Sequence, residues 1–368
     1  MTHYIEDGRE NLGVAYFSLM REISGAVHEK ILSYIEDGEQ YKTEDLRNEL
    51  MDIPKARAGK NIMRSALTLL MYRLNGGVGT ILEILPALAV SELNNVNAYL
   101  DNIVFDDKKG IWRGGNTRRR ISGITIASGI FRELTEKAVL DIPTSDVNKV
   151  AVLSSLCECM KKSYLGQYVD MKIGIAEVDF FENDQSYFDW YVEKSELQSG
   201  FLYGFSAKLG AILAGVDGDQ IEKSEEIGKI IGLGVHVSND LGDFAILSQQ
   251  EESTGFKKPQ DQMADLINGR LTFPIYHILK YGSSQERNII LDMVGNNHAT
   301  QKELLEVIGV VHSSGAFDFG KKFIREYYKK ARKLINSSFP ASRERGMLKA
   351  MTSVIVSNKF LSALRDQK

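Results

Sequence analysis

The sequence predicts an all-α protein that folds as one large domain. Proline, which breaks helices, occurs only six times in 368 residues. Long stretches repeat apolar residues at helical spacing, among them Ile81–Val90, Ala207–Gly215 and Glu226–Val235. No Pro/Gly/Ser-rich linker or low-complexity tract divides the chain. We therefore expect residues 1–368 to form a single domain.

The composition argues against several classes of function. Hydrophobic residues make up 43% of the chain and charged residues 26%, which is ordinary for a globular protein. The net charge of −4 gives no reason to expect a nucleic-acid partner, and the basic run Arg118–Arg120 is too short to change that.

Cys157 and Cys159 point apart on a helix and have no second pair for zinc, so we expect thiols in a reducing compartment. The N-terminus does not show the pattern of a signal peptide, and no uncharged apolar run reaches 18 residues, so we expect a soluble, cytoplasmic protein.

Helical patterns cover most of the chain, taken in order from the N-terminus. Residues 1–50 are expected to form an N-terminal extension of amphipathic helices, and Ile81–Asp107 one long helix. Residues 182–186 have the composition of a loop with a helix cap. Further helices are expected at 196–215 and 226–240, and two or three amphipathic helices at the C-terminus within 300–368.

An acidic pattern ends the apolar stretch at 226–235. His236, Asn239, Asp240 and Asp243 are spaced i, i+3, i+4 and i+7, which predicts one shared helix face. A buried helix that carries two carboxylates is costly unless a cation lies against them. Hard oxygen ligands without thiolates favour Mg²⁺, which usually keeps waters and shares its shell with substrate phosphates. For this segment alone, a solvated polar face near a helix end is the alternative explanation.

A second acidic stretch follows the apolar run Ile81–Val90. Asn102 and Asp106 share a helix face because they are spaced i, i+4, and Asp101 and Asp107 lie beside them. Two acidic faces, each on an apolar helix, suggest two groups of ligands around a metal–diphosphate cluster.

These stretches resemble the trans-isoprenyl diphosphate synthases, the polyprenyl synthetase family. The first aspartate-rich motif of that family is matched by Asp101-Asn102 and Asp107, followed by Trp112-Arg113-Gly114. The second motif is matched by Asn239-Asp240 and Asp243. The resemblance implies an all-α isoprenoid synthase bundle around a central cavity, a homodimer, and three Mg²⁺ ions. The metal ligands that it implies are Asp101, Asn102, Asp106, Asp107, Asn239, Asp240 and Asp243.

Further motifs of the family match positions between 58 and 274. Leu165–Asp170 resembles the Gly-Gln-x-x-Asp element, and Asp265–Pro274 resembles the Asp-x-x-x-Gly-Lys-x-Thr-Leu-Pro signature with Arg270 in place of Lys. Lys194-Ser195 resembles the Lys-Thr pair that contacts the allylic diphosphate. The residues implied to bind substrate are Lys60, Arg64, Asn95, Arg113, Gln167, Lys194 and Arg270. Those implied to take part in catalysis are Lys194, Gln198, Asp101 and Asp240.

The family resemblance also places the floor of the cavity. A bulky aromatic residue four or five positions before the first Asp stops chain growth in the family, and those positions are Asn97 and Val96 here. We therefore expect a cavity that accepts chains of C20 or longer, unless Leu93 or Phe201 closes it.

The departures from the family motifs leave three hypotheses open. Asn replaces Asp at 102 and 239, Trp112 replaces an Arg, and Asn95 replaces a His, so the site carries less charge. The favoured function is Mg²⁺-dependent condensation of an allylic diphosphate with isopentenyl diphosphate, with products in the C15–C25 range. One alternative is a diverged enzyme, either a class I terpene cyclase or a prenyltransferase for another acceptor. The other is a catalytically silent subunit of a heteromeric synthase.

Overall fold

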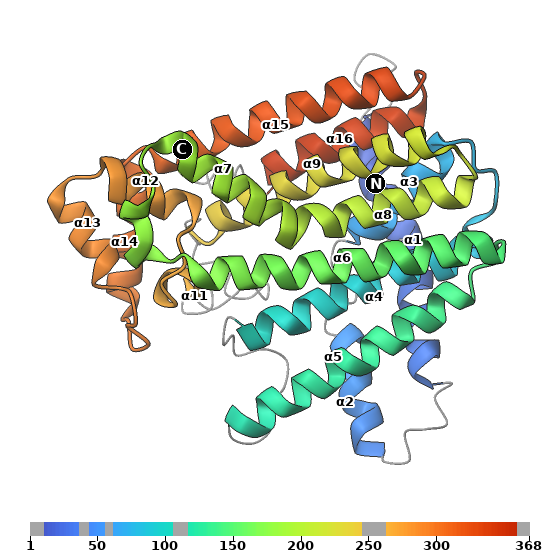
Figure 1. Ribbon diagram of the computed structural model, residues 1–368, viewed down its shortest axis with the longest axis horizontal. Helices are drawn as coiled ribbons and strands as arrows, with labels where there is room; N and C mark the ends of the chain where they lie inside the picture. The colour runs from blue at the N-terminus through green and yellow to red at the C-terminus, as the bar shows by residue number, and fades with distance from the viewer. Residues whose placement is uncertain (1–10, 37–43, 56–61, 106–116, 245–262, 359–368) are drawn as a thin grey trace. The chain divides into compact units, whose positions relative to one another are not determined.

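The computed structural model describes residues 11–36, 44–55, 62–105, 117–244 and 263–358. Within these ranges the chain is helical and contains no strand, so the all-α prediction is confirmed (Figure 1). By its internal contacts the chain divides into two compact units. Unit 1 comprises residues 1–161, 201–229 and 332–351, and unit 2 comprises 162–200, 230–331 and 352–368. The expectation of a single domain stays a prediction.

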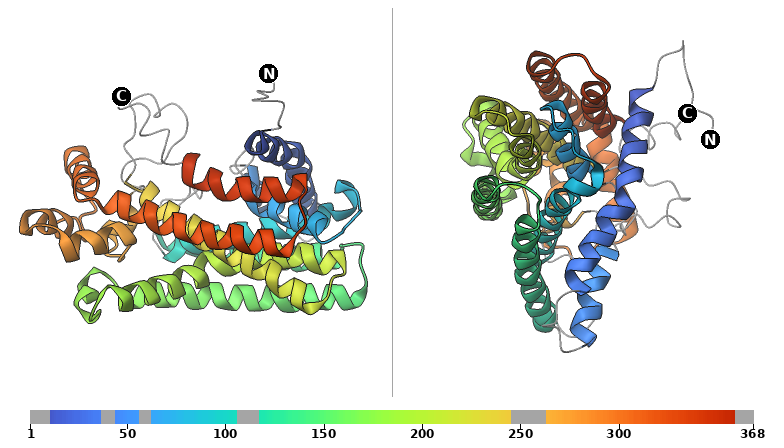
Figure 2. Two further views of the ribbon diagram at one scale, coloured as in Figure 1. Left: turned by 90° about the horizontal axis from the view of Figure 1, so that it is seen from above. Right: turned by 90° about the vertical axis from the view of Figure 1, so that its right-hand side faces the viewer.

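Unit 1 is built mainly from long helices near the N-terminus, which Figure 2 shows in two further views. Helix α4 packs against α5 and α1, and α3 packs against α8 and α4. The helices are α1 (Leu12–Glu36), α2 (Glu44–Lys55), α3 (Met63–Leu74), α4 (Ile81–Phe105), α5 (Thr117–Leu140) and α8 (Phe201–Ala214), together with the first part, residues 343–351, of α16 (Arg343–Asn358). Helix α3 is buried over Ser65–Met71 and α8 over Leu202–Ala207, so their contact forms part of the core. Burying each large aliphatic side chain contributes about 1.5–3 kcal/mol, which holds these helices together.

Unit 2 carries shorter helices and a cluster of aromatic side chains. Helices α12, α13 and α14 pack against one another. Tyr187 stacks on Tyr276 with ring centroids 3.5 Å apart, and Phe273 stacks on Phe319 at 5.1 Å. The elements are η1 (Ile175–Phe180), α7 (Asp184–Ser195), η2 (Glu196–Gly200), α11 (Ala264–Ile267), α12 (Phe273–Tyr281), α13 (Ser284–Leu291), α14 (Gln301–Ser313) and most of α15 (Ala316–Ser338). Helices α6 (Asp146–Lys172) and α9 (Gly218–Gly242) contribute residues to both units.

Several local predictions are confirmed. Asn183 caps α7 by accepting a hydrogen bond from the backbone N–H of Ser186 at 3.0 Å, as the loop-and-cap pattern at 182–186 indicated. The N-terminal extension forms α1 and α2, and the C-terminal part forms α14, α15 and α16. Helix α4 ends at Phe105, and Asp106 and Asp107 lie outside the described residues.

One element was not predicted from the sequence, the π-helix η2. It follows α7 without a break and precedes α8. Residues 230–242 of α9 pass close to it, because a Cβ atom at Gly232 would lie 2.5 Å from the carbonyl oxygen of Ser199. Only glycine allows the two backbones to approach this closely. π-Helical turns occur frequently at functional sites, and η2 carries Gln198 and Ser199.

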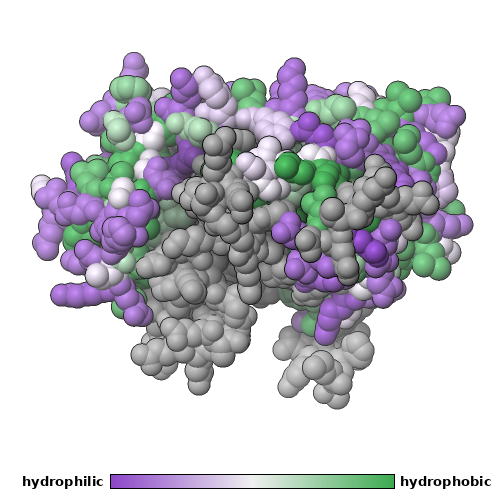
Figure 3. Space-filling view, turned by 90° about the horizontal axis from the view of Figure 1, so that it is seen from below, coloured by the Kyte–Doolittle hydropathy of each residue, from purple (hydrophilic) through white to green (hydrophobic). Residues whose placement is uncertain are grey.

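The surface of the described residues is mixed in character. Figure 3 shows hydrophilic and hydrophobic residues interspersed over one face. Among the helices that the structure describes, none is long and apolar enough to cross a membrane.

Candidate active site

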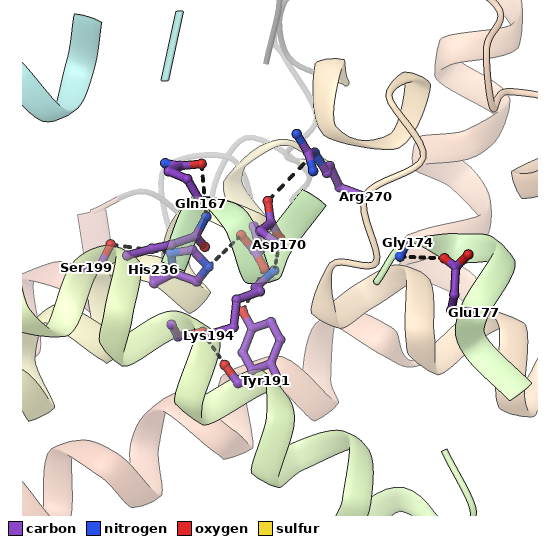
Figure 4. A network of polar contacts seen from close by, with 12 residues as sticks. Gln167, Asp170, Gly174, Glu177, Tyr191, Lys194, Ser199, His236 and Arg270 are labelled. Carbon is purple, nitrogen blue, oxygen red and sulfur yellow. Dashed lines mark hydrogen bonds and ion pairs between the residues drawn. The ribbon is translucent and has the colours of Figure 1, made fainter. Parts of the chain in front are cut away.

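Three charged side chains meet in unit 2. Lys194 on α7 donates a hydrogen bond to Oδ1 of Asp170 on α6 at 2.7 Å, and Nε of Arg270 lies 3.7 Å from Oδ2 of Asp170 (Figure 4). Lys194 is 2% exposed and Asp170 is 7% exposed. The sequence predicted Lys194 and Arg270 as phosphate-binding residues, and the structure places both against one carboxylate.

The charges of this cluster depend on one another. Burial would raise the pKa of Asp170, but the ammonium group of Lys194 and the guanidinium group of Arg270 outweigh it and hold that pKa below its ordinary value. Burial would lower the pKa of Lys194, and the carboxylates of Asp170 and Asp240 outweigh it and raise that pKa. Both groups are therefore ionised at neutral pH.

The turn that carries Arg270 explains the local sequence. Gly269 has φ +73°, a left-handed conformation that glycine adopts without strain. The carbonyl oxygen of Gly269 accepts a hydrogen bond from Ile175 at 2.8 Å, and the N–H of Arg270 donates to Asp265 at 2.8 Å. Thr272 then precedes α12 as its N-cap residue, and proline in the first turn suits the start of that helix. The Gly-Arg-x-Thr-Phe-Pro pattern thus fixes Arg270 at a rigid corner.

Asp240 lies in a second polar group of unit 2. The hydroxyl of Tyr191 donates to Oδ2 of Asp240 at 2.7 Å, and Nε2 of His236 lies 3.9 Å from Oδ1. Nδ1 of His236 lies 3.3 Å from the hydroxyl of Ser199 on η2. Asp240 is buried and Asp243 is partly buried, whereas Asn239 is exposed. His236, Asn239 and Asp240 lie on helix α9, as their spacing predicted, and the role of Asn239 as a ligand stays a prediction.

The two predicted glutamines are also close together. Nε2 of Gln198 on η2 lies 3.4 Å from Oε1 of Gln167 on α6, and Gln167 is buried.

Unit 1 brings together two residues predicted for a diphosphate. Arg64, in the first turn of α3, donates a hydrogen bond to Oδ1 of Asn95 on α4. Nδ2 of Asn95 donates to Glu92 at 3.0 Å, so the amide orientation is fixed. The guanidinium of Arg64 also lies over the ring of Tyr203, 4.7 Å from its centroid. Arg64 and Asn95 are therefore held together in unit 1.

The first acidic motif is described only in part. Asp101 accepts a hydrogen bond from the hydroxyl of Ser128 on α5 at 2.9 Å, and Asn102 is partly buried. Val96 and Asn97 are buried, and Asn97 donates to Thr135 on α5 at 3.2 Å. The predicted site residues that lie outside the described residues are Lys60, Asp106, Asp107 and Arg113.

Some polar partners were not predicted to act with the site. Tyr191, Ser128 and Glu92 each hold a predicted site residue, and Ser199 holds His236. Tyr191 comes three residues before Lys194, which places both on one side of α7. That spacing is the only signal of Tyr191 in the sequence, because its contact with Asp240 joins residues 49 positions apart.

The donor set is compatible with magnesium. Its predicted members are carboxylates and amides, the hard oxygen ligands that Mg²⁺ prefers. Among the described residues, no three His, Cys, Asp or Glu side chains gather into a metal-binding cluster. Mg²⁺ commonly takes only one or two carboxylates and completes its shell with water and substrate phosphates, so the buried Asp240 of unit 2 fits such a role.

The all-α fold and the cluster of buried lysine, arginine and carboxylate side chains can now be set beside known proteins. The sequence pattern of the Polyprenyl synthetase family matches residues 45–311. The chain belongs to the polyprenyl synthetase family and is accordingly a prenyltransferase of the isoprenyl diphosphate synthase type.

Individual relatives agree with this assignment. A geranylgeranyl diphosphate synthase from Methanosarcina mazei is 25% identical over 288 residues, covering 76% of this chain and 80% of the relative. A short chain isoprenyl diphosphate synthase from Methanocaldococcus jannaschii is 27% identical over 260 residues, covering 70% and 74%. The crystal structure of a polyprenyl synthase from Caulobacter crescentus has a similar fold, with a TM-score of 0.74, 18% identity and coverage of 92% and 96%.

Proposed function

We propose that this protein is a Mg²⁺-dependent trans-prenyltransferase that condenses an allylic diphosphate with isopentenyl diphosphate. The product would be a polyprenyl diphosphate in the C15–C25 range. The observation that carries this proposal is the buried cluster of Lys194, Asp170 and Arg270. Relatives named geranylgeranyl and geranylfarnesyl diphosphate synthases support the chain-length range.

Binding of a diphosphate explains the cluster of Lys194, Asp170 and Arg270 better than a contribution to the stability of the fold does. Moving the charged groups of a lysine and an aspartate out of water costs several kcal/mol per ion. A buried ion pair therefore contributes little net stability to a fold. Lys194 has donors beyond the one that Asp170 accepts, and Arg270 offers a planar fork for phosphate oxygens. Because Asp170 holds both cations, they remain charged and oriented for a leaving diphosphate.

In unit 1, Arg64 and Asn95 would bind the diphosphate of the second substrate. The contact of Arg64 with Tyr203 fixes the guanidinium, and Glu92 fixes the amide of Asn95. Asp240 and Asp243, both in unit 2, would hold magnesium. When bound, magnesium would supply Lewis-acid stabilisation of the charge on the departing diphosphate.

The test is a product assay with the purified protein, Mg²⁺, and allylic diphosphates of ten, fifteen and twenty carbons. We expect a longer diphosphate that forms only when isopentenyl diphosphate and Mg²⁺ are both present. Product formed without isopentenyl diphosphate would contradict elongation and favour a cyclase. Absence of diphosphate release under every condition would favour a silent subunit.

The first prediction concerns product length. We expect Val96→Phe to shorten the product or exclude the longest allylic substrate, because Val96 is buried on α4 a little more than one turn before Asp101. A phenyl ring there fills space that a growing chain would need. Val90→Phe is the matched control, since Val90 is equally buried on α4 two turns earlier. Product distributions by chromatography decide the question, and identical distributions for wild type and Val96→Phe would place the floor elsewhere.

The second prediction concerns the homodimer, which we propose to form through α6. Val147 is 77% exposed and Val150 is 65% exposed, and both lie on α6 with the exposed Cys157 two turns further. Burial raises the pKa of Cys159 to about 12, so Cys157 is the thiol expected to react in the folded protein. We expect alkylation of Cys157 to slow as protein concentration rises, and Val150→Lys to abolish that protection. A sedimentation experiment that shows only monomer at every protein concentration would contradict the dimer.

The expected cytoplasmic location remains a prediction.

A further inference from the structure

Tyr191 holds one oxygen of Asp240. The tyrosine is fully buried, and its hydroxyl donates to Oδ2 at 2.7 Å. Hydrogen bonds to an ionised carboxylate are shorter and stronger than those between neutral groups. The hydroxyl is the donor of this pair, because the ionised carboxylate of Asp240 can only accept.

The other oxygen of Asp240 is differently placed. Nε2 of His236 lies 3.9 Å from Oδ1, which is too long for a hydrogen bond. Nε2 itself has no hydrogen-bond partner among the described residues. Oδ1 is therefore the oxygen that can accept a further ligand.

We infer that Tyr191 is a positioning residue that holds Oδ2 of Asp240 and thereby presents Oδ1 to a magnesium–diphosphate complex. This inference rests on the proposed function, in which Asp240 is a metal ligand. A carboxylate that can rotate can present either oxygen, or both, to a metal ion. The carboxylate of Asp240, with its Oδ2 held by Tyr191, presents only Oδ1. Single-oxygen ligation suits Mg²⁺, which requires near-octahedral geometry and keeps several waters.

Unit 2 contains a matched control for Tyr191. Tyr187 lies one turn earlier on α7 and is equally buried. Its hydroxyl has no hydrogen-bond partner among the described residues, and its ring stacks on Tyr276. Tyr191→Phe and Tyr187→Phe each remove one buried hydroxyl, but only the first removes a contact with Asp240.

The experiment measures Mn²⁺ binding in the presence of inorganic pyrophosphate by electron paramagnetic resonance, and the Mg²⁺ dependence of turnover. Partners that orient a metal ligand typically affect metal affinity about 10–100-fold, so we expect Tyr191→Phe to weaken Mn²⁺ binding at least about tenfold. The Mg²⁺ concentration for half-maximal turnover should rise by a similar factor, whereas Tyr187→Phe should behave like wild type. In an Asp240→Asn background, Tyr191→Phe should add no further loss, because the two residues act as one unit.

Each outcome bears on the inference. Equal Mn²⁺ affinity of Tyr191→Phe and Tyr187→Phe would overturn it, as would an undiminished effect of Tyr191→Phe in the Asp240→Asn background. Wild-type protein that binds no Mn²⁺ with pyrophosphate would overturn it as well. If Mn²⁺ binding behaves as expected but no prenyl product forms, the positioning role stands and the proposed condensation fails. Circular dichroism confirms that each variant is folded before either measurement.

Discussion

Asp240→Asn should lower kcat/KM for the allylic substrate by about 10³-fold, because it removes one anionic ligand from a site that acts by electrostatic stabilisation. The substitution keeps the shape of the side chain, and its amide oxygen can still accept the hydrogen bond from Tyr191. We therefore expect the free energy of unfolding to change little. The loss should appear in turnover and in Mn²⁺ affinity together.

Asp189→Asn is the control for Asp240→Asn. Asp189 is exposed on α7 and accepts a hydrogen bond from Gln185, so the same chemical change occurs away from the cluster. Turnover should remain at the wild-type level. Folded Asp240→Asn protein with the turnover of Asp189→Asn would exclude Asp240 as a metal ligand.

Lys194→Met should damage both stability and activity, for separable reasons. The substitution leaves Asp170 buried, with Nε of Arg270 still 3.7 Å from its Oδ2. Breaking a buried ion pair costs about 3–5 kcal/mol, and Arg270 should keep the loss near the lower end of that range. The allylic diphosphate also loses a cation, so turnover should fall about 10²–10³-fold.

The double variant Asp170→Asn with Lys194→Met separates these two effects. The change at Asp170 removes the carboxylate that Lys194→Met leaves without its lysine partner, and much of the lost stability should return in urea unfolding. Turnover should remain as low as in Lys194→Met. Recovery of turnover together with stability would show that Lys194 serves the fold and not the substrate.

The fold was predictable because helical periodicity and the scarcity of proline act locally along the chain. The family motifs pointed to Lys194, Asp170 and Arg270, and they also named Arg64 and Asn95, which the structure brings into contact. They did not reveal that Asp170 contacts both cations, since those contacts join α6 to residues 24 or more positions away. Spacing along α9 also does not state which side of the helix faces the core, so the exposure of Asn239 could not be predicted.

The partners of the acidic residues could not be predicted for a related reason. Ser128 and Tyr191 are ordinary helix residues in the sequence, and only the crossing of helices within each unit gives them a carboxylate to hold. Glu92 stood in a family pattern, but its bond to Asn95 depends on the rotamer of both side chains.

The π-helix η2 has a consequence for comparison with relatives. A π-helix bonds residue i to i+5 where an α-helix bonds i to i+4, so η2 accommodates one residue more than a regular turn. A relative with a regular helix at this place would match this chain only across a one-residue gap. If such a relative is aligned without a gap and the residues after Gly200 are matched correctly, Lys194 is paired with the residue next to its true equivalent. Deleting one residue within 196–200 should likewise turn the ammonium group about 100° away from Asp170 without breaking a single helix.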